Sequence, residues 1–413
     1  MLELLESLPV GIRMVRVDSC MLTQQGTPGE SHYIYDPGMA AGKRHDGQLR
    51  ARLAGKRVIV TLGAGGVGKT TTSAALALGL AMRGAKAAVV TIDPARRLAS
   101  SLGLDELSGE PHRIDDAALS RAGVTVKGEL WAMMLDAKAT FDAVVSNLAA
   151  DQDAREEILA NPVYGEISTA VAGSQELSAV AKLYELYEEH DFDVIVLDTP
   201  PSRNALDFLD APGRLLGFLE GRALQVFIAP GGLTARLFGR GTALVFSIFA
   251  RVTGVDMFSE LSRFFRSMGG VLDGFGERTR AVQELLRSKE VMFLIVTSPE
   301  PEPVREARFL AARLAETRRP APQLIVNRVH LEGLGQRSES ELTEQMAPAL
   351  GAELARRVAA NLADIDVLVR RDRLAVEELS DLLEGESPVL VGHLDEEVQD
   401  LLGLTRIAEQ LGL

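Results

Sequence analysis

The sequence has little cysteine and no excess of positive charge. Its 413 residues include a single cysteine, Cys20. That count excludes an intramolecular disulfide and any metal site built from several thiolates. Lys and Arg number 44 against 58 Asp and Glu, which gives a formal net charge of −14. Surfaces that bind nucleic acid normally need clustered basic residues, so we expect no nucleic-acid partner.

A secretory leader and a long apolar run are also missing. The first residues, MLELLESLPVG, are acidic where a signal peptide is basic. A membrane helix needs about 20 mostly apolar residues, but the best candidate, 242–258, is interrupted by Arg251 and Asp256. We therefore expect a cytoplasmic protein that reaches a membrane only peripherally, through a partner.

Residues 56–72 read KRVIVTLGAGGVGKTTT. The apolar start predicts a buried strand, and 63–70 then match G-x-x-x-x-G-K-[ST] where a helix is expected to begin. In such a loop, backbone N–H groups surround phosphates, the lysine adds positive charge and the hydroxyl after it ligates Mg²⁺. The same letters contain G-x-G-x-x-G, which is typical of dinucleotide sites, but the Lys-Thr pair favours a nucleoside triphosphate.

The rest of the chain alternates between strand-like and helical patterns. Residues 1–52 show little periodicity, which predicts an irregular N-terminal extension. In 53–413, apolar runs predict strands at 58–62, 87–93, 193–198, 291–298 and 323–329. Strands that alternate with helices predict an α/β fold of the P-loop NTPase type, with a mostly parallel central sheet flanked by helices. Extra helical patterns at about 137–190 and 212–289 predict a helical subdomain inserted above the carboxyl edge of the sheet.

Two aspartates end predicted strands. Asp198 ends VIVLD, where a carboxylate can hold Mg²⁺, usually through water. Asp93 ends AAVVTID, where a carboxylate can position the attacking water and sense the γ-phosphate. The alternative for Asp198 is a helix cap, and for Asp93 a cap or turn residue.

Three ordered motifs resemble the ArsA family: GAGGVGKTTT, TIDPARRLAS (91–100) and FDVIVLDTPPSRNALDFL (192–209). That family comprises the ATPase subunits of arsenite pumps and the ATPases that target tail-anchored membrane proteins. The resemblance implies ATP and Mg²⁺ as ligands, with Lys69 and Asp93 as catalytic groups. It places Thr70, Asp198 and Asp93 at the metal. The nucleotide-binding residues that it implies are Gly63, Ala64, Gly65, Gly66, Val67, Gly68, Lys69, Thr70, Thr71 and Asn327.

For Asn327, the resemblance implies a contact with adenine. An asparagine at a strand end can instead cap a turn, and that alternative stays open.

Several positions depart from the family pattern. Ala64 stands where a lysine usually reaches across a dimer to the partner's phosphates, and Asn204 replaces a histidine. Either Arg96, Arg97 or Arg203 substitutes for the lysine, or a paralogous subunit supplies it. The cysteines that bind arsenite and the zinc-binding Cys-x-x-Cys of dimeric members are absent. Any dimer must therefore close through other contacts.

Residues 258–275 place eight apolar side chains near helical spacing. They either pack the helical subdomain or line a groove for a transmembrane helix. We expect an ATP-hydrolysing switch whose closure, as a homodimer or with a paralogue, captures apolar helices of a membrane-protein client. The alternatives are an ATPase subunit that drives a membrane anion transporter, and a low-turnover regulatory partner of a paralogous ATPase.

Overall fold

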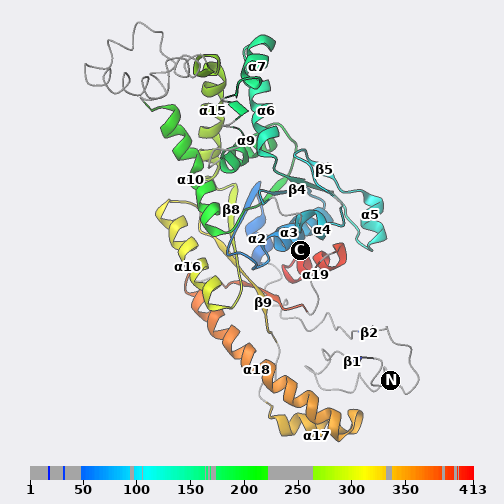
Figure 1. Ribbon diagram of the computed structural model, residues 1–413. Helices are drawn as coiled ribbons and strands as arrows, with labels where there is room; N and C mark the ends of the chain where they lie inside the picture. Colours follow the sequence, from blue (N-terminus) through cyan, green and yellow to red (C-terminus); the bar gives the residue numbers. More distant parts are fainter. Residues whose placement is uncertain are drawn as a thin grey trace.

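The computed structural model describes residues 17–18, 31–32, 48–93, 97–104, 106–162, 164–165, 168, 174–221, 264–331, 337–383, 387–394, 398 and 400–413. Its centre is an eight-stranded sheet in the order β10-β9-β8-β3-β7-β4-β6-β5 (Figure 1). Neighbouring strands are parallel, except that β5 runs antiparallel to β6. These strands are β3 (Val58–Leu62), β4 (Lys86–Thr91), β5 (His112–Arg113), β6 (Glu129–Met134), β7 (Val194–Asp198), β8 (Val291–Thr297), β9 (Gln323–Val329) and β10 (Val389–Gly392). Two further short strands, β1 (Val17–Asp18) and β2 (Ser31–His32), pair with each other.

The helices lie on both faces of the sheet and at its ends. Their bounds are α2 (Gln48–Leu53), α3 (Lys69–Met82), α4 (Arg97–Ser101), α5 (Asp116–Arg121), α6 (Ala137–Leu148), α7 (Gln152–Leu159), α9 (Ser174–Glu188), α10 (Ser202–Leu219), α15 (Gly269–Leu285), α16 (Pro301–Glu316), α17 (Glu339–Leu350), α18 (Ala352–Ser380) and α19 (Leu401–Gln410). The predicted α/β fold with a mostly parallel sheet is confirmed. The five predicted strands coincide with β3, β4, β7, β8 and β9 to within two residues.

Alternate side chains of the central strands enter two separate cores, as the two-residue period of a strand requires. Ile59 and Val196 pack with α3 and α19 in one core, while Val60 and Leu197 pack with α9, α10 and α16 in the other. Strands buried on both faces read as continuous apolar runs. This explains why the central strands could be predicted from the sequence.

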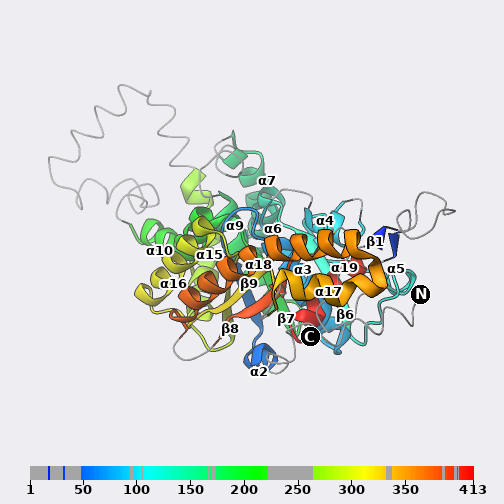
Figure 2. The same cartoon turned by 90° about the horizontal axis from the view of Figure 1, so that it is seen from below.

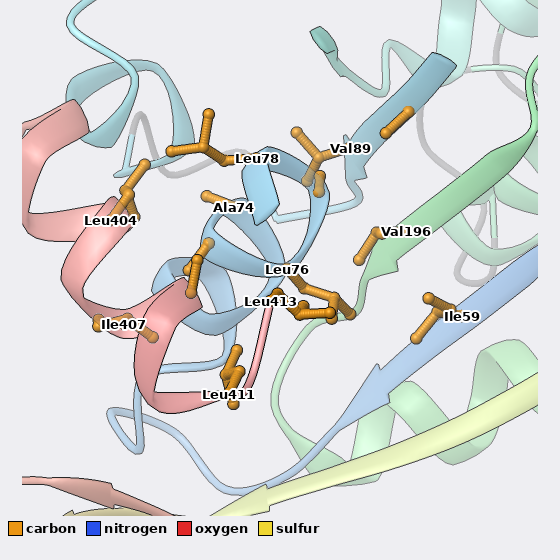
Figure 3. Close-up of a cluster of buried hydrophobic side chains, with 14 of the residues drawn as sticks. Ile59, Ala74, Leu76, Leu78, Val89, Val196, Leu404, Ile407, Leu411 and Leu413 are labelled. Carbon is orange, nitrogen blue, oxygen red and sulfur yellow. The ribbon is translucent and has the colours of Figure 1, made fainter. Parts of the chain in front are cut away.

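Helix α19 packs against α3, the helix that follows the glycine-rich loop (Figure 3). Its Leu404 and Ile407, followed by Leu411 and Leu413, belong to the same buried cluster as the apolar face of α3. A Cβ placed on Gly79 of α3 would lie 2.7 Å from the Cβ of Leu413. The glycine therefore permits the C-terminal Leu413 to pack closely against the last turn of α3.

A third core lies among α6, α7, α9, α10 and α15, in the region predicted to hold a helical subdomain. Phe264, Val271 and Phe275 are buried there, and Met268 packs against them. These members of the apolar stripe are thus core residues, whereas Phe258 and Leu261 lie outside the described part of the chain. Among the helices that the structure describes, none is long and apolar enough to cross a membrane.

Helix α10 begins at Ser202 and passes through Pro212, although the second insertion was predicted to start at 212. Proline lacks an N–H group and disturbs the helical bonds of carbonyls one turn earlier. Arg319, which precedes β9, donates from Nη2 to the carbonyl of Leu209 at 2.6 Å and from Nη1 to Leu286 at 3.3 Å. The guanidinium of Arg319 thus links α10 and the end of α15 to the segment that leads into β9.

Helices α17 and α18 form an antiparallel pair that the sequence analysis did not predict. Figure 2 shows them side by side, and Figure 1 shows that they lie at the end of the molecule opposite α6 and α15. A small core between them includes Leu342, Met346 and Val358. Ser338 begins α17 with a reciprocal capping box to Glu341, which satisfies the first N–H groups of the helix.

The core position of Phe264 leads to a stability prediction. Phe264 is 1% exposed, so Phe264→Ser should lower the free energy of unfolding by about 3–5 kcal/mol, the usual loss for removing a buried aromatic ring. Phe309 on α16 is 56% exposed, and Phe309→Ser should change stability by about 0.5 kcal/mol or less. Urea unfolding of both variants measures the difference. Equal stability of the two would mean that Phe264 is not a core residue.

Candidate nucleotide site

The candidate site lies where the central strands end. In the sheet, Asp198, the last residue of β7, is paired with Thr61 of β3 on one side and with Thr91 of β4 on the other. The backbone N–H of Ile92 also donates to the carbonyl of Asp198 at 3.0 Å. Parallel strands thus bring the end of β4, the end of β7 and the loop after β3 to one edge, where ligands bind in open α/β sheets.

The glycine-rich loop crosses this edge between β3 and α3. A Cβ on Gly63 would lie 2.0 Å from the carbonyl oxygen of Val296 in β8, so only glycine fits there. Gly68 precedes α3 with a φ of 96°, in the left-handed region, and no side chain caps the first turn of the helix. The free N–H groups of that turn and the helix dipole favour an anion at this point.

The ammonium group of Lys69 is folded back onto its own loop. Its Nζ donates to the carbonyls of Gly63 at 3.0 Å and Ala64 at 2.8 Å. Burial lowers the pKa of Lys69, while the nearby carboxylates of Asp198 and Asp93 act in the opposite direction. A buried cation held only by carbonyls beside orphan N–H groups is arranged for a polyanion.

Asp198 is 1% exposed, and one of its oxygens is shared by two hydroxyl groups. Thr70 donates to Oδ2 at 2.8 Å, and Thr91 donates to the same atom at 3.0 Å. Burial raises the pKa of Asp198 to about 6, although both hydroxyls and the Lys69 ammonium act against that rise. Both hydrogen bonds to the Asp198 carboxylate in the described part of the chain come from hydroxyl groups and none from a helix N–H, as the capping alternative would require. The role of Asp198 at the metal stays a prediction.

These residues fit a magnesium ion. The second oxygen of Asp198, Oδ1, is buried and has no hydrogen-bond partner in the described structure. It lies on the residue whose other oxygen contacts Thr70, so a hydroxyl and a carboxylate meet beside the phosphate loop. Mg²⁺ prefers such hard oxygen ligands, takes few of them from protein and keeps several waters. Within the described residues, no group of three or more His, Cys, Asp or Glu side chains forms another candidate metal site.

Asp93 lies at the same edge, two residues beyond the end of β4. Its backbone N–H donates to the Thr91 hydroxyl at 3.2 Å, and its side chain is only partly buried. Its negative charge acts on Lys69, which places it within electrostatic range of the loop. The roles of Asp93 in water activation and metal binding stay predictions.

Asn327 lies within β9, two residues before the strand ends, and contacts the glycine-rich loop. Its Nδ2 donates to the carbonyl of Val67 at 2.8 Å, and its Oδ1 accepts from the N–H of Arg328 at 2.9 Å. A Cβ on Gly68 would lie 2.3 Å from the same Nδ2, so the amide packs directly against the loop. The structure gives Asn327 a supporting role, and its predicted contact with adenine stays a prediction.

Thr91 and Thr61 contribute to the site, and the sequence analysis missed both. Thr61 shares a 2.9 Å hydrogen bond with Ser73 of α3 and lies within 3.0 Å of the carbonyl of Leu197. Thr199, just after β7, donates to the carbonyl of Thr61 at 2.6 Å. The available signal was a hydroxyl residue at or near the end of three apolar runs, at a position where a buried strand otherwise carries Val or Ile.

Several residues of the second and third motifs (91–100 and 192–209) lie outside the described structure. They are Pro94, Ala95 and Arg96, together with the side chains of Arg203 and Asn204. Arg97 is described: it begins α4, is exposed, and its charge acts on Lys69 in opposition to the carboxylates. The side chain of Ala64 is buried, 7% exposed, in the core cluster that also holds Val67.

The family model described as Anion-transporting ATPase, ArsA, matches residues 56–346. The chain belongs to this family. The match covers more than half of the chain and includes the loop, Asp93, Asp198 and Asn327. The resemblance inferred from the three motifs is therefore confirmed.

Individual relatives are similar at modest identity. ATPase ARSA1 of Chlamydomonas reinhardtii is 26% identical over 346 residues, or 76% of this chain and 41% of that protein. ATPase GET3 of Malassezia globosa is 27% identical over 226 residues, or 53% of this chain and 59% of the relative. ATPase GET3C of Arabidopsis thaliana is 27% identical over 280 residues, or 65% of each. The chain thus spans less than two thirds of each relative.

Proposed function

We propose that this chain is a Mg²⁺-dependent ATP hydrolase that acts as a nucleotide switch. The observation that carries the proposal is the meeting of Thr70 and Asp198, 2.8 Å apart, beside the Lys69 ammonium and the uncapped first turn of α3. Such a group of N–H donors, a cation and oxygen ligands is suited to a nucleoside triphosphate with its metal. Membership in the ArsA family supports ATP as the nucleotide.

The proposal gives a role to each of the site residues at the carboxyl edge of the sheet. The loop N–H groups and Lys69 bind the phosphates, and Lys69 moves from the carbonyls of its own loop to the phosphate oxygens. Thr70 and Asp198 hold Mg²⁺, which when bound neutralises charge on the transferred phosphoryl group. Asp93 orients the attacking water. Asn327 keeps the loop in its binding shape.

The path from this site to the helical subdomain is short. Helix α10 begins at Ser202, close after Asp198, and packs against α9 and α15. A change at the end of β7 can therefore shift these helices together. We propose that this movement accompanies closure of a dimer, with itself or a paralogue, and capture of an apolar membrane-protein client. The similarity to GET3 ATPases supports the proposal. Phe264 and its neighbours give it no support, because they are buried in the core and do not line a groove.

Ala64 offers no cation to a partner's phosphates, so the missing charge must come from elsewhere. Arg97 favours a source within the same chain, because it is exposed and its charge reaches Lys69. We expect Arg97→Ala to lower kcat of the purified chain by about 10³-fold, the lower end of the effect of an arginine finger, while ATP affinity changes little. Steady-state phosphate release measures this, with exposed Arg318→Ala as the matched control.

The same assay distinguishes a cation supplied by the same chain from one supplied by a paralogous subunit. Slow turnover of the wild-type chain, with no further loss in Arg97→Ala and a gain in Ala64→Lys, would show that a partner normally supplies the cation. Because the Ala64 side chain is buried, the thermal stability of Ala64→Lys has to be measured alongside. Absence of Mg²⁺-dependent turnover in every variant and with added partners would contradict the hydrolase itself.

A further inference from the structure

We propose that Thr91 is a positioning residue that fixes Asp93 and Asp198 relative to each other before nucleotide binds. The inference rests on the proposed nucleotide site. It assigns to a side chain at the end of β4 the task of setting the geometry of the two carboxylates that the proposed reaction uses.

The hydroxyl of Thr91 contacts both aspartate segments at once. It donates to Asp198 Oδ2 at 3.0 Å and accepts from the backbone N–H of Asp93 at 3.2 Å. A hydroxyl has one hydrogen to donate and two lone pairs, so both bonds form together. The carbonyl of Asp93, at 3.4 Å, is a longer and weaker alternative acceptor for the same hydrogen.

The surroundings of Thr91 make this link rigid. Its side chain is 1% exposed, and its backbone carbonyl accepts from the N–H of Leu135, which anchors the end of β4 to the segment after β6. In the sheet, Thr91 lies directly beside Asp198. The branched side chain is restricted in its rotamers, so the hydroxyl cannot swing away cheaply.

The two bonds have distinct consequences for the site. The bond to Oδ2, with that from Thr70, fixes the plane of the Asp198 carboxyl group and leaves Oδ1 as its unpartnered oxygen. The bond from the Asp93 N–H fixes the backbone at Asp93, and thereby the position of its Cα, from which the side chain extends. Partners that orient a metal-binding carboxylate typically change metal affinity 10- to 100-fold when they are removed.

A purely structural role would look different. Thr279 in α15 is also fully buried, but its hydroxyl donates only to the carbonyl of Phe275, one turn earlier in the same helix. Thr91→Val and Thr279→Val therefore make the same chemical change at two buried sites. Only the first removes a bond between separate functional segments.

The direct test needs no nucleotide. Amide hydrogen exchange of the ligand-free protein should show faster exchange, by about 10-fold or more, at Asp93 in Thr91→Val, because that N–H loses its acceptor. Thr91→Ser keeps the hydroxyl and should restore protection, while Thr279→Val should leave Asp93 unchanged. Equal exchange at Asp93 in the wild type and Thr91→Val would overturn the proposal.

The second test separates positioning from folding. In Thr91→Val we expect kcat to fall about 10- to 100-fold and the Mg²⁺ concentration for half-maximal rate to rise about 10-fold, with KM for ATP within about 3-fold of wild type. Thr91→Ser should recover most of both losses. Wild-type kcat and Mg²⁺ dependence in Thr91→Val would contradict the inference alone. A wild-type chain without any Mg²⁺-dependent turnover would instead contradict the proposed function, and the exchange experiment would still decide the role of Thr91.

Discussion

Replacing Lys69 with alanine should abolish tight ATP binding. The ammonium group is buried at the loop, is held by the Gly63 and Ala64 carbonyls, and belongs to the first residue of α3, whose first turn has no side-chain cap. Loss of one preorganised donor from a site of this kind costs about 10²–10³-fold, and the positive charge adds to that. We therefore expect ATP affinity or kcat/KM to fall by at least about 10²-fold.

The control for this variant is Lys138→Ala. Lys138 is an exposed lysine on α6 that pairs with Asp142 at 2.6 Å. Its loss should leave ATP binding and turnover within about 2-fold of wild type, because exposed ion pairs contribute about 0–1 kcal/mol. Titration with a fluorescent ATP analogue compares the two. Wild-type affinity and turnover in Lys69→Ala would remove the basis for the assigned site.

Replacing Asp93 with asparagine should slow hydrolysis far more than binding. Asparagine keeps the size of the side chain and the backbone N–H that bonds to Thr91, but it removes the negative charge that orients water. General-base groups typically contribute about 10²–10⁴-fold to rate, so kcat should fall by that order while ATP affinity stays within about 3-fold. The variant should therefore accumulate in its ATP-bound form.

Single-turnover measurement with pre-bound ATP isolates this step from substrate binding. Asp153→Asn, an exposed change in the first turn of α7, serves as the matched control and should hydrolyse at the wild-type rate. If Asp93→Asn also retains the wild-type single-turnover rate, Asp93 is only the turn residue that its sequence position allowed.

The parts of the fold that were predictable are those in which one physical signal dominates. β3, β7 and β8 are buried on both faces and read as unbroken apolar runs. β6, in contrast, has both buried and half-exposed positions, and β10 has only four residues, so neither produced a strong apolar run. The order of strands in the sheet could not be predicted, because it depends on packing between segments far apart in the sequence.

Some residues of the candidate site could likewise be predicted from the sequence, and others could not. The loop and both aspartates follow from local patterns, because glycine, lysine and carboxylate at strand ends have few other uses in this combination. Thr91 was missed because its function depends on β4 lying beside β7, which brings its hydroxyl to Asp198. The family resemblance predicted that Asn327 contacts adenine. Its observed contact with Val67 joins positions 260 residues apart, which no local sequence pattern relates.

The central claim is that the edge formed by Lys69, Thr70 and Asp198 binds ATP together with Mg²⁺. Calorimetric titration of ATP into the purified wild-type chain, once with Mg²⁺ and once with EDTA, tests it most directly. We predict saturable binding that is at least about 10-fold tighter with Mg²⁺, because the ion can then use the Thr70 hydroxyl and the unpartnered Oδ1 of Asp198 as ligands. Binding of equal strength in both solutions, or no binding in either, would contradict the account.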